Sequence, residues 1–287
     1  MGNKLIVTAA PHITGPDTTQ KIMQRVCIAL LPTLIASILI FGINSLILTV
    51  ITVAACMFFE WGYCKLAGRE VPVGDFSAAV TGVLLAFNLP ATLPWWMAIV
   101  GAFIAIVIVK QLFGGLGYNV ANPAIVARIA LAMGFASRMA NYPHPANGID
   151  ALASATPLAV SGQMGAADYV TLLLGNHGGV LGETCAITLL LGGIYLIATK
   201  VISPVIPVTY LATVAVLSAV SGHDPIVQLL SGGLMLGAFF MATDYVTSPV
   251  TKKGEIIFGI GCGLLTVFIR YFGGYPEGVS YSILIMN

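Results

Sequence analysis

The chain has 287 residues, of which 58% are hydrophobic and only 8% are charged, and its mean hydropathy is +0.97. These values lie far outside the range of soluble domains and predict a membrane protein. The net charge of +1 argues against nucleic acid as a partner, because binding to phosphates requires a surplus of basic residues.

Nine apolar stretches are long enough, or nearly so, to cross a hydrocarbon core about 30 Å thick. They are residues 26–43, 46–63, 76–89, 95–113, 124–140, 184–201, 205–220, 226–242 and 256–272. Residues 279–286 are apolar but too short, so we expect a tenth span that is truncated in this sequence. Residues 169–174 fit a re-entrant or interfacial segment. The sequence therefore predicts an all-α polytopic membrane protein with about ten transmembrane helices.

The basic residues predict how the chain is oriented. With the N-terminus in the cytoplasm, nine of the twelve lie on the inside, two lie outside, and Arg128 lies within the fifth span. The loop formed by residues 141–183 then faces the exterior. The inner residues are Lys4, Lys21, Arg25, Lys65, Arg69, Lys110, Lys200, Lys252 and Lys253, and the outer ones are Arg138 and Arg270.

Five spans on each side of this loop give two halves of opposite orientation, which indicates an inverted repeat. The predicted units are the N-terminal five-helix repeat 1–140, the loop 141–183 and the C-terminal repeat 184–287, with its last helix incomplete. Asp75 and Asp224 open corresponding spans, and a Phe-Gly-Gly sequence ends another corresponding pair at 113–115 and 272–274. The glycines at 259, 261 and 263 fit close helix packing.

A glycine- and asparagine-rich segment, residues 114–123, follows the fourth span on the cytoplasmic side. No strand precedes it, so it does not fit a dinucleotide-binding loop. Asn119 and Asn122 can cap the fifth helix, with Pro123 in its first turn, or they can contact a ligand. The sequence does not decide between these two roles.

The exterior loop contains Asp150-Ala151-Leu152-Ala153-Ser154-Ala155-Thr156-Pro157-Leu158. Pro157 favours an extended backbone at Thr156, and the small residues before it leave the hydroxyl accessible to a modifying enzyme. This segment resembles the flavin-attachment motif of the D subunits of Rnf electron-transport complexes and of the related B subunits of sodium-translocating NADH:quinone oxidoreductase. Ser154 stands where that family often has glycine.

Further stretches extend the resemblance over nearly the whole chain, and the short segment before the first span favours the Rnf D subunit. They are residues 11–12, 21–23, 26–32, 81–94, 111–123, 241–249 and 275–279. The resemblance implies FMN joined to Thr156 by a phosphoester, with Asp150 and Ser154 in the attachment motif. It also implies noncovalent riboflavin on the cytoplasmic side, where Asn119 and Asn122 are the candidate contacts.

The implied function is electron relay within a complex of the bacterial cytoplasmic membrane that couples ferredoxin:NAD electron transfer to Na⁺ or H⁺ translocation. The implied partners are the other Rnf subunits (A, B, C, E and the FMN-carrying G) and a flavin transferase. As one part of a complex, the chain needs no catalytic acid, base or nucleophile of its own. A flavin-free channel or solute transporter with an inverted repeat is the alternative.

Ionisable residues at membrane depth are candidates for ion coupling, namely Asp75, Asp244 and Arg128. Asp75 can instead cap a helix, and Asp244 can simply lie near Lys252 and Lys253. The cysteines and histidines show no metal-ligand spacing, so we expect no metal site within the chain, although one cysteine could be shared with a partner. These residues are Cys27, Cys56, Cys64, Cys185, Cys262, His12, His144, His177 and His223.

Overall fold

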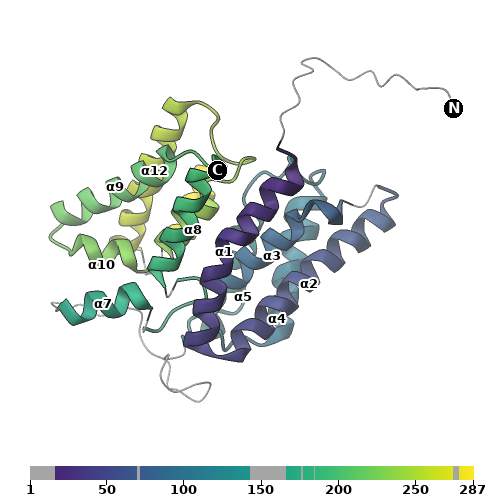
Figure 1. Cartoon of the computed structure of the whole chain (residues 1–287), viewed down its shortest axis with the longest axis horizontal. Coiled ribbons are helices and arrows are strands. Elements are labelled where there is room, and N and C mark those ends of the chain that lie inside the picture. Colours follow the sequence, from purple (N-terminus) through teal and green to yellow (C-terminus); the bar gives the residue numbers. More distant parts are fainter. Residues whose placement is uncertain (1–16, 70–71, 143–165, 176, 184, 274–277) are drawn as a thin grey trace.

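The computed structural model describes residues 17–69, 72–142, 166–175, 177–183, 185–273 and 278–287, and these residues form helices and connecting turns without a strand (Figure 1). The first half contains α1 (Thr19–Phe41), α2 (Ile43–Leu66), η1 (Val73–Asp75), α3 (Ser77–Phe87), α4 (Trp95–Phe103), η2 (Ile104–Gln111), α5 (Pro123–Gly134) and α6 (Ala136–Met139). Then follow α7 (Ala166–Leu174), α8 (Ala186–Ala198), α9 (Val205–Val220), α10 (Pro225–Leu230), α11 (Leu234–Leu236), η5 (Gly237–Met241), α12 (Lys252–Phe272) and α13 (Val279–Met286).

Every predicted apolar stretch contains one or more of the observed helices. Helices α1, α2 and α12 are each long and apolar enough to cross a membrane, and five further apolar helices have 10 to 17 residues. The expected all-helical membrane fold is therefore confirmed in its coarse form.

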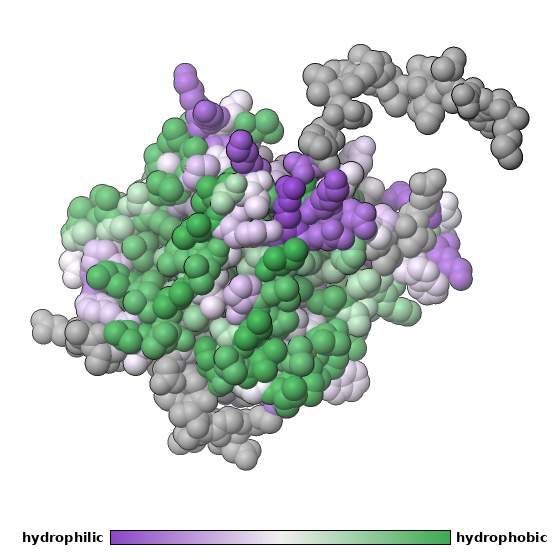
Figure 2. All heavy atoms as spheres, viewed as in Figure 1, coloured by the Kyte–Doolittle hydropathy of each residue, from purple (hydrophilic) through white to green (hydrophobic). Residues whose placement is uncertain are grey.

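The outer surface of the bundle is apolar, as a lipid-facing surface requires. On α1, for example, Leu39 is 81% exposed, and on α12 Phe268 is 61% exposed. Figure 2 shows hydrophobic side chains along the helices and hydrophilic ones gathered where α1 begins. We call this the basic end, because exposed lysines and arginines lie there at the start of α1, the end of α2, the turn after α8 and the start of α12: Lys21, Lys65, Arg69, Lys200, Lys252 and Lys253.

Helix α1 lies between the two halves of the chain (Figure 1). On one side it contacts α2 and α3, and on the other it contacts α8. Within the first half, α2 packs against α3 and α4, and within the second half, α9 packs against α10 and α12. The packing of α9 on α12 depends on glycine, because a Cβ at Gly259 would lie 2.0 Å from Thr209 Oγ1 and one at Gly263 would lie 2.6 Å from Thr213 Cβ. The predicted packing role of these glycines is confirmed.

The expected continuous eighth span, residues 226–242, is wrong. The helix is interrupted at Ser231–Gly233, where Gly232 and Gly233 have left-handed backbone angles (φ 74° and 66°) that favour glycine. Side chains from elsewhere replace the helical hydrogen bonds that are lost. Arg270 donates to the carbonyls of Gln228 (2.6 Å) and Ser231 (2.9 Å), and the Gly232 amide donates to the buried Glu183 carboxylate.

A buried connection that is not a helix, residues 177–183, crosses between the two halves before α8 begins. The Leu181 amide donates to the Leu89 carbonyl (3.0 Å), and the Gly182 amide donates to the Phe87 carbonyl (2.8 Å). These bonds satisfy carbonyls where α3 ends. Backbone polar groups inside a bilayer must be paired in this way, so the segment is held firmly by its partners.

Candidate functional site

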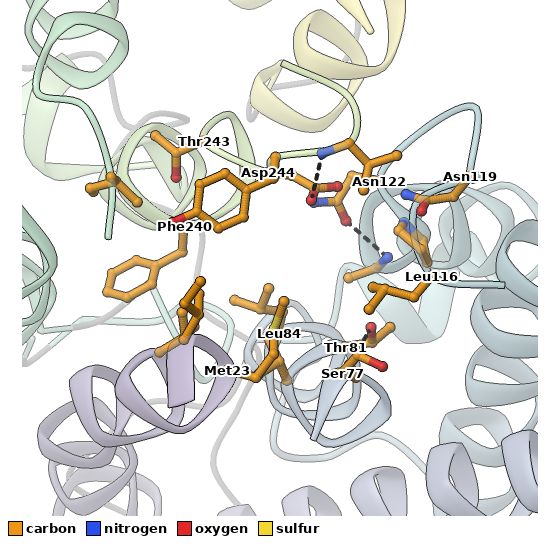
Figure 3. Close-up of a pocket in the computed structure, with 18 of the residues that line it drawn as sticks. Met23, Ser77, Thr81, Leu84, Leu116, Asn119, Asn122, Phe240, Thr243 and Asp244 are labelled. Carbon is orange, nitrogen blue, oxygen red and sulfur yellow. Dashed lines mark hydrogen bonds between the residues drawn. The ribbon is translucent and has the colours of Figure 1, made fainter. Parts of the chain in front are cut away.

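A cavity of about 100 Å³ opens at the basic end of the bundle, and we call it the inner pocket. Its walls come from both halves of the chain: α1, α3, η2 and the start of α5 on one side, and α8, η5 and the turn after η5 on the other (Figure 3). Most lining side chains are apolar, and the polar and charged ones are Ser77, Thr81, Lys110, Asn119, Asn122, Thr243, Asp244 and Tyr245. A mostly apolar lining with a few convergent polar groups is typical of sites for small organic ligands.

Asn122 caps α5, which is one of the two roles that the sequence left open. Its Oδ1 accepts hydrogen bonds from the amides of Ala124 (3.0 Å) and Ile125 (3.4 Å), which makes it the N-cap of α5 with Pro123 at the first helical position. Its Nδ2 donates to the Met241 carbonyl (3.3 Å) at the end of η5, so the residue also joins the two halves. The side chain lines the inner pocket as well.

Asn119 and Asp244 lie close to Asn122 in the lining of the pocket (Figure 3). The Asn119 Nδ2 donates to the Ala121 carbonyl (3.3 Å), and the side chain also interacts with the Asp244 carboxylate. Asp244 further accepts from the Val246 amide (3.4 Å) and the Thr247 hydroxyl (3.3 Å). Among the described residues these are its partners, so the interpretation of Asp244 as a neighbour of the two lysines at 252 and 253 is not supported.

Burial raises the pKa of the Asp244 carboxyl above its usual value, and hydrogen bonds from Val246, Thr247 and Asn119 together with the charge of Lys110 offset only part of the rise. An acid with a raised pKa keeps its proton closer to neutral pH than a solvated acid does.

A buried ion pair between α2 and η2 lies beside the pocket. Lys110 Nζ lies 2.6 Å from Glu60 Oε1, and the two side chains are only 3% and 0% exposed. The same ammonium donates to Ser77 Oγ (2.6 Å), and Gln111 Nε2 donates to the same Glu60 oxygen (3.0 Å). Lys110 was expected on the inner side, and it lies at the end of η2 with its side chain buried in the bundle and lining the inner pocket.

Sequence reasoning missed this pair, since Glu60 and Lys110 are 50 residues apart on different helices. One signal was available: Glu60 is the single acidic residue within the second predicted span, and a buried acid at membrane depth requires a partner.

Asp75 is a helix cap, which was one of its two expected roles. Its Oδ1 accepts from the Ser77 amide (2.7 Å) and from the Ser77 hydroxyl (2.6 Å). Phe76 between them has a left-handed backbone (φ 64°), which is a strained conformation for a bulky residue and costs about 1–2 kcal/mol. This backbone conformation places Ser77 at the pocket, where its hydroxyl accepts a hydrogen bond from Lys110.

Arg128 is buried as expected for a residue within the fifth span, and its Nη1 donates to Ser280 Oγ (2.6 Å) on α13.

Arg270 was expected at the outer boundary, but it is engaged with the interrupted helix and also donates to Gln228 Oε1 (2.9 Å). Both guanidinium groups lie within electrostatic range of Glu183. Ion coupling at Asp75, Asp244 or Arg128 stays a prediction.

The sequence matches the NQR2, RnfD, RnfE family over residues 6–287. The chain belongs to this family. A relative from Acetobacterium woodii, the D subunit of a Na(+)-translocating ferredoxin:NAD(+) oxidoreductase complex, is 50% identical over 99% of this chain and 90% of its own length. The D subunit of the proton-translocating ferredoxin:NAD(+) oxidoreductase complex of Clostridium ljungdahlii is 40% identical over 99% and 92%. The D subunit of the ion-translocating oxidoreductase complex of Stutzerimonas stutzeri is 39% identical over 94% and 88%.

The family resemblance predicted from the sequence is thus confirmed. These relatives are named as subunits of larger complexes. Two similar relatives are named for different ions, so membership of the family does not identify the coupling ion.

The predicted attachment residues Asp150, Ser154 and Thr156 lie outside the described residues. Covalent FMN at Thr156 therefore stays a prediction. Among the described residues no group of three or more histidine, cysteine, aspartate or glutamate side chains could hold a metal ion. Four of the cysteines are buried and the fifth, Cys27, is partly buried, as expected for core residues.

Proposed function

We propose that this chain is the membrane flavoprotein component of an ion-translocating ferredoxin:NAD⁺ oxidoreductase, and that it relays electrons between two flavins. One flavin is FMN joined to Thr156 on the extracytoplasmic loop, and the other is riboflavin held noncovalently in the inner pocket. The observation that carries the proposal is the pocket itself, in which Asn119, Asn122 and Asp244 meet at the basic end of a chain that belongs to the RnfD family.

The residues of the inner pocket fit a flavin. An isoalloxazine has a broad apolar face and one edge of carbonyl and N–H groups. Phe239, Phe240 and Leu84 offer apolar contacts for the face, and the amides of Asn119 and Asn122 can donate to and accept from the edge. When bound, the flavin supplies the electron transfer, while the chain positions it and sets its electrostatic surroundings.

The proposed topology follows from the charges. The basic end faces the cytoplasm by the positive-inside rule, so residues 141–183 face the exterior of the cytoplasmic membrane. The packing also supports an inverted repeat of five plus five spans. Helix α2 ends at the basic end and α9 begins there, yet each packs against the next two predicted spans of its own half: α2 against α3 and α4, and α9 against α10 and α12. Asp75 caps α3, and Asp224 caps α10 through the Ile226 amide (2.9 Å).

The proposed partners are the other subunits of the complex, A, B, C, E and G, together with the flavin transferase that modifies Thr156. Electrons arrive at the exterior flavin from the G subunit and return inward through the pocket flavin. A flavin-free channel with the same fold is the competing function, and it predicts an unmodified Thr156 and no pigment in the pocket.

The test separates the two flavins. The full chain is purified from cells that contain a flavin transferase, and acid precipitation releases noncovalent flavin, which chromatography identifies. We expect riboflavin in the supernatant and in-gel fluorescence in the pellet that disappears in Thr156→Ala but persists in Ser161→Ala, a control in the same loop outside the attachment motif. Absence of both signals from the wild-type chain would support the channel instead.

A further inference from the structure

The inner pocket has an uneven distribution of charge. Of the described residues that line it, Lys110 is the one base and Asp244 is the one acid, and they come from opposite halves of the chain. All other lining residues are neutral. A molecule in this pocket therefore faces a single fixed cation, from η2.

The position of that cation is determined by two contacts of 2.6 Å, one to Glu60 Oε1 and one to Ser77 Oγ. Ser77 is itself fixed by Asp75, and Glu60 is fixed further by Gln111. The ammonium thus has little freedom to turn away from the pocket or to reach solvent. The second Glu60 oxygen has no hydrogen-bond partner among the described residues. The carboxylate therefore makes its hydrogen bonds with Lys110 and Gln111 through one oxygen.

We propose that Lys110 is the positive charge that stabilises the reduced form of a flavin in the inner pocket. The negative charge of Glu60 partly offsets this stabilisation and so sets its size. This inference rests on the proposed function, since it needs the pocket to hold a flavin. It adds two residues for which neither the family resemblance nor the sequence pattern supplied a role.

The reason is charge balance. When an oxidised isoalloxazine takes two electrons from the reduced donor of the complex and one proton from water, it gains one net negative charge. In a pocket of low polarity that charge is poorly screened, so a fixed ammonium nearby favours the reduced form. Glu60 carries the opposite charge and lies on the far side of the ammonium, so it weakens this effect while holding Lys110 in place.

The test uses the opposite charges of Lys110 and Glu60. The full chain carries Thr156→Ala, so that its remaining flavin absorbance comes from the pocket, and this parent is titrated with a reductant in the presence of redox mediators. Lys110→Met should lower the ratio of reduced to oxidised flavin at a fixed potential by at least tenfold, which is about 30 mV for a two-electron couple. Glu60→Gln should raise that ratio, and Lys110→Arg, which keeps the charge, should stay close to the parent.

A merely structural role for the pair predicts a different result, because both neutral variants would then shift the ratio in the same direction or leave it unchanged. Either outcome overturns the inference while the proposed function stands. If Lys110→Met no longer binds flavin, Glu60→Gln still tests the proposal. An unchanged or lowered ratio of reduced to oxidised flavin in that variant contradicts it. If the parent chain itself binds no noncovalent flavin, the proposed function and this inference both fail.

Discussion

Asn122 and Met241 join the two halves of the chain through a hydrogen bond of 3.3 Å from the asparagine Nδ2 to the methionine carbonyl. The other end of the same side chain caps α5. One residue thus stabilises a helix start and the contact between the halves, and two different variants can separate these contributions.

Asn122→Ala removes both interactions. We expect it to lower the free energy of unfolding by about 1 kcal/mol for the cap and by a further ~1–3 kcal/mol for the unpaired buried carbonyl. Asn122→Ser keeps a capping oxygen but is too short to reach Met241, so its stability should fall between wild type and Asn122→Ala. Thermal unfolding in detergent measures the order, and equal stability of the two variants would show that the cap contributes nothing.

Removing one member of the buried ion pair should destabilise the chain strongly. Glu60→Ala leaves the Lys110 ammonium inside the bundle with only Ser77 as a described partner, and the expected cost is about 3–5 kcal/mol. The double variant Glu60→Leu with Lys110→Met removes both charges and should recover most of that loss. Denaturant unfolding of the purified chain checks this, and a double variant as unstable as Glu60→Ala would contradict it.

The contact between α9 and α12 should not tolerate a side chain at Gly263. A Cβ there would lie 2.6 Å from Thr213 Cβ, and the backbone carbonyl of Tyr210 lies behind it at 3.3 Å. We expect Gly263→Ala to lower the unfolding temperature by several degrees, because overpacking costs about 1–3 kcal/mol. Gly62→Ala on α2 is the matched control: nothing lies within 4 Å of its Cβ, so the variant should be neutral or slightly stabilising.

The hydrogen bond from the Tyr169 hydroxyl to Asp224 ties α7 to the start of α10. It lowers the pKa of the partly exposed Asp224 carboxyl below its usual value. Because the folded-state pKa is depressed, the stabilisation is present at neutral pH and is lost only as the pH falls through that lowered value. In Tyr169→Phe the pKa returns towards that of an ordinary aspartate, so α7 should detach at a higher pH. Pepsin cleavage within α7, followed over a series of acidic pH values, reports the difference, and identical profiles would exclude the coupling.

Much of the fold could be predicted from the sequence because lipid imposes one simple rule, that a crossing helix must be apolar over most of its length. The rule located every helical region, including α7 and α13. It could not locate the interruption at Ser231, because the neighbouring residues remain apolar and the replacement hydrogen bonds come from Arg270 and Glu183, both distant in the sequence.

The candidate site was only partly predictable for the same reason. Asn119 and Asn122 stand out in the sequence because a polar, glycine-rich segment borders an apolar helix. Their meeting with Asp244 depends on packing between the halves, which no local pattern encodes. The pairing of Lys110 with Glu60 likewise required the side-by-side placement of α2 and η2. The attachment role of Thr156 stays a prediction.

The inner pocket takes its walls from α3 and η2 on one side and from α8 and η5 on the other. Any molecule bound there is a mechanical link across the centre of the bundle. A change in its charge acts at the same moment on Lys110 in the first half and on Asp244 in the second. One change in the charge of a bound molecule would therefore be felt by charged side chains of both halves.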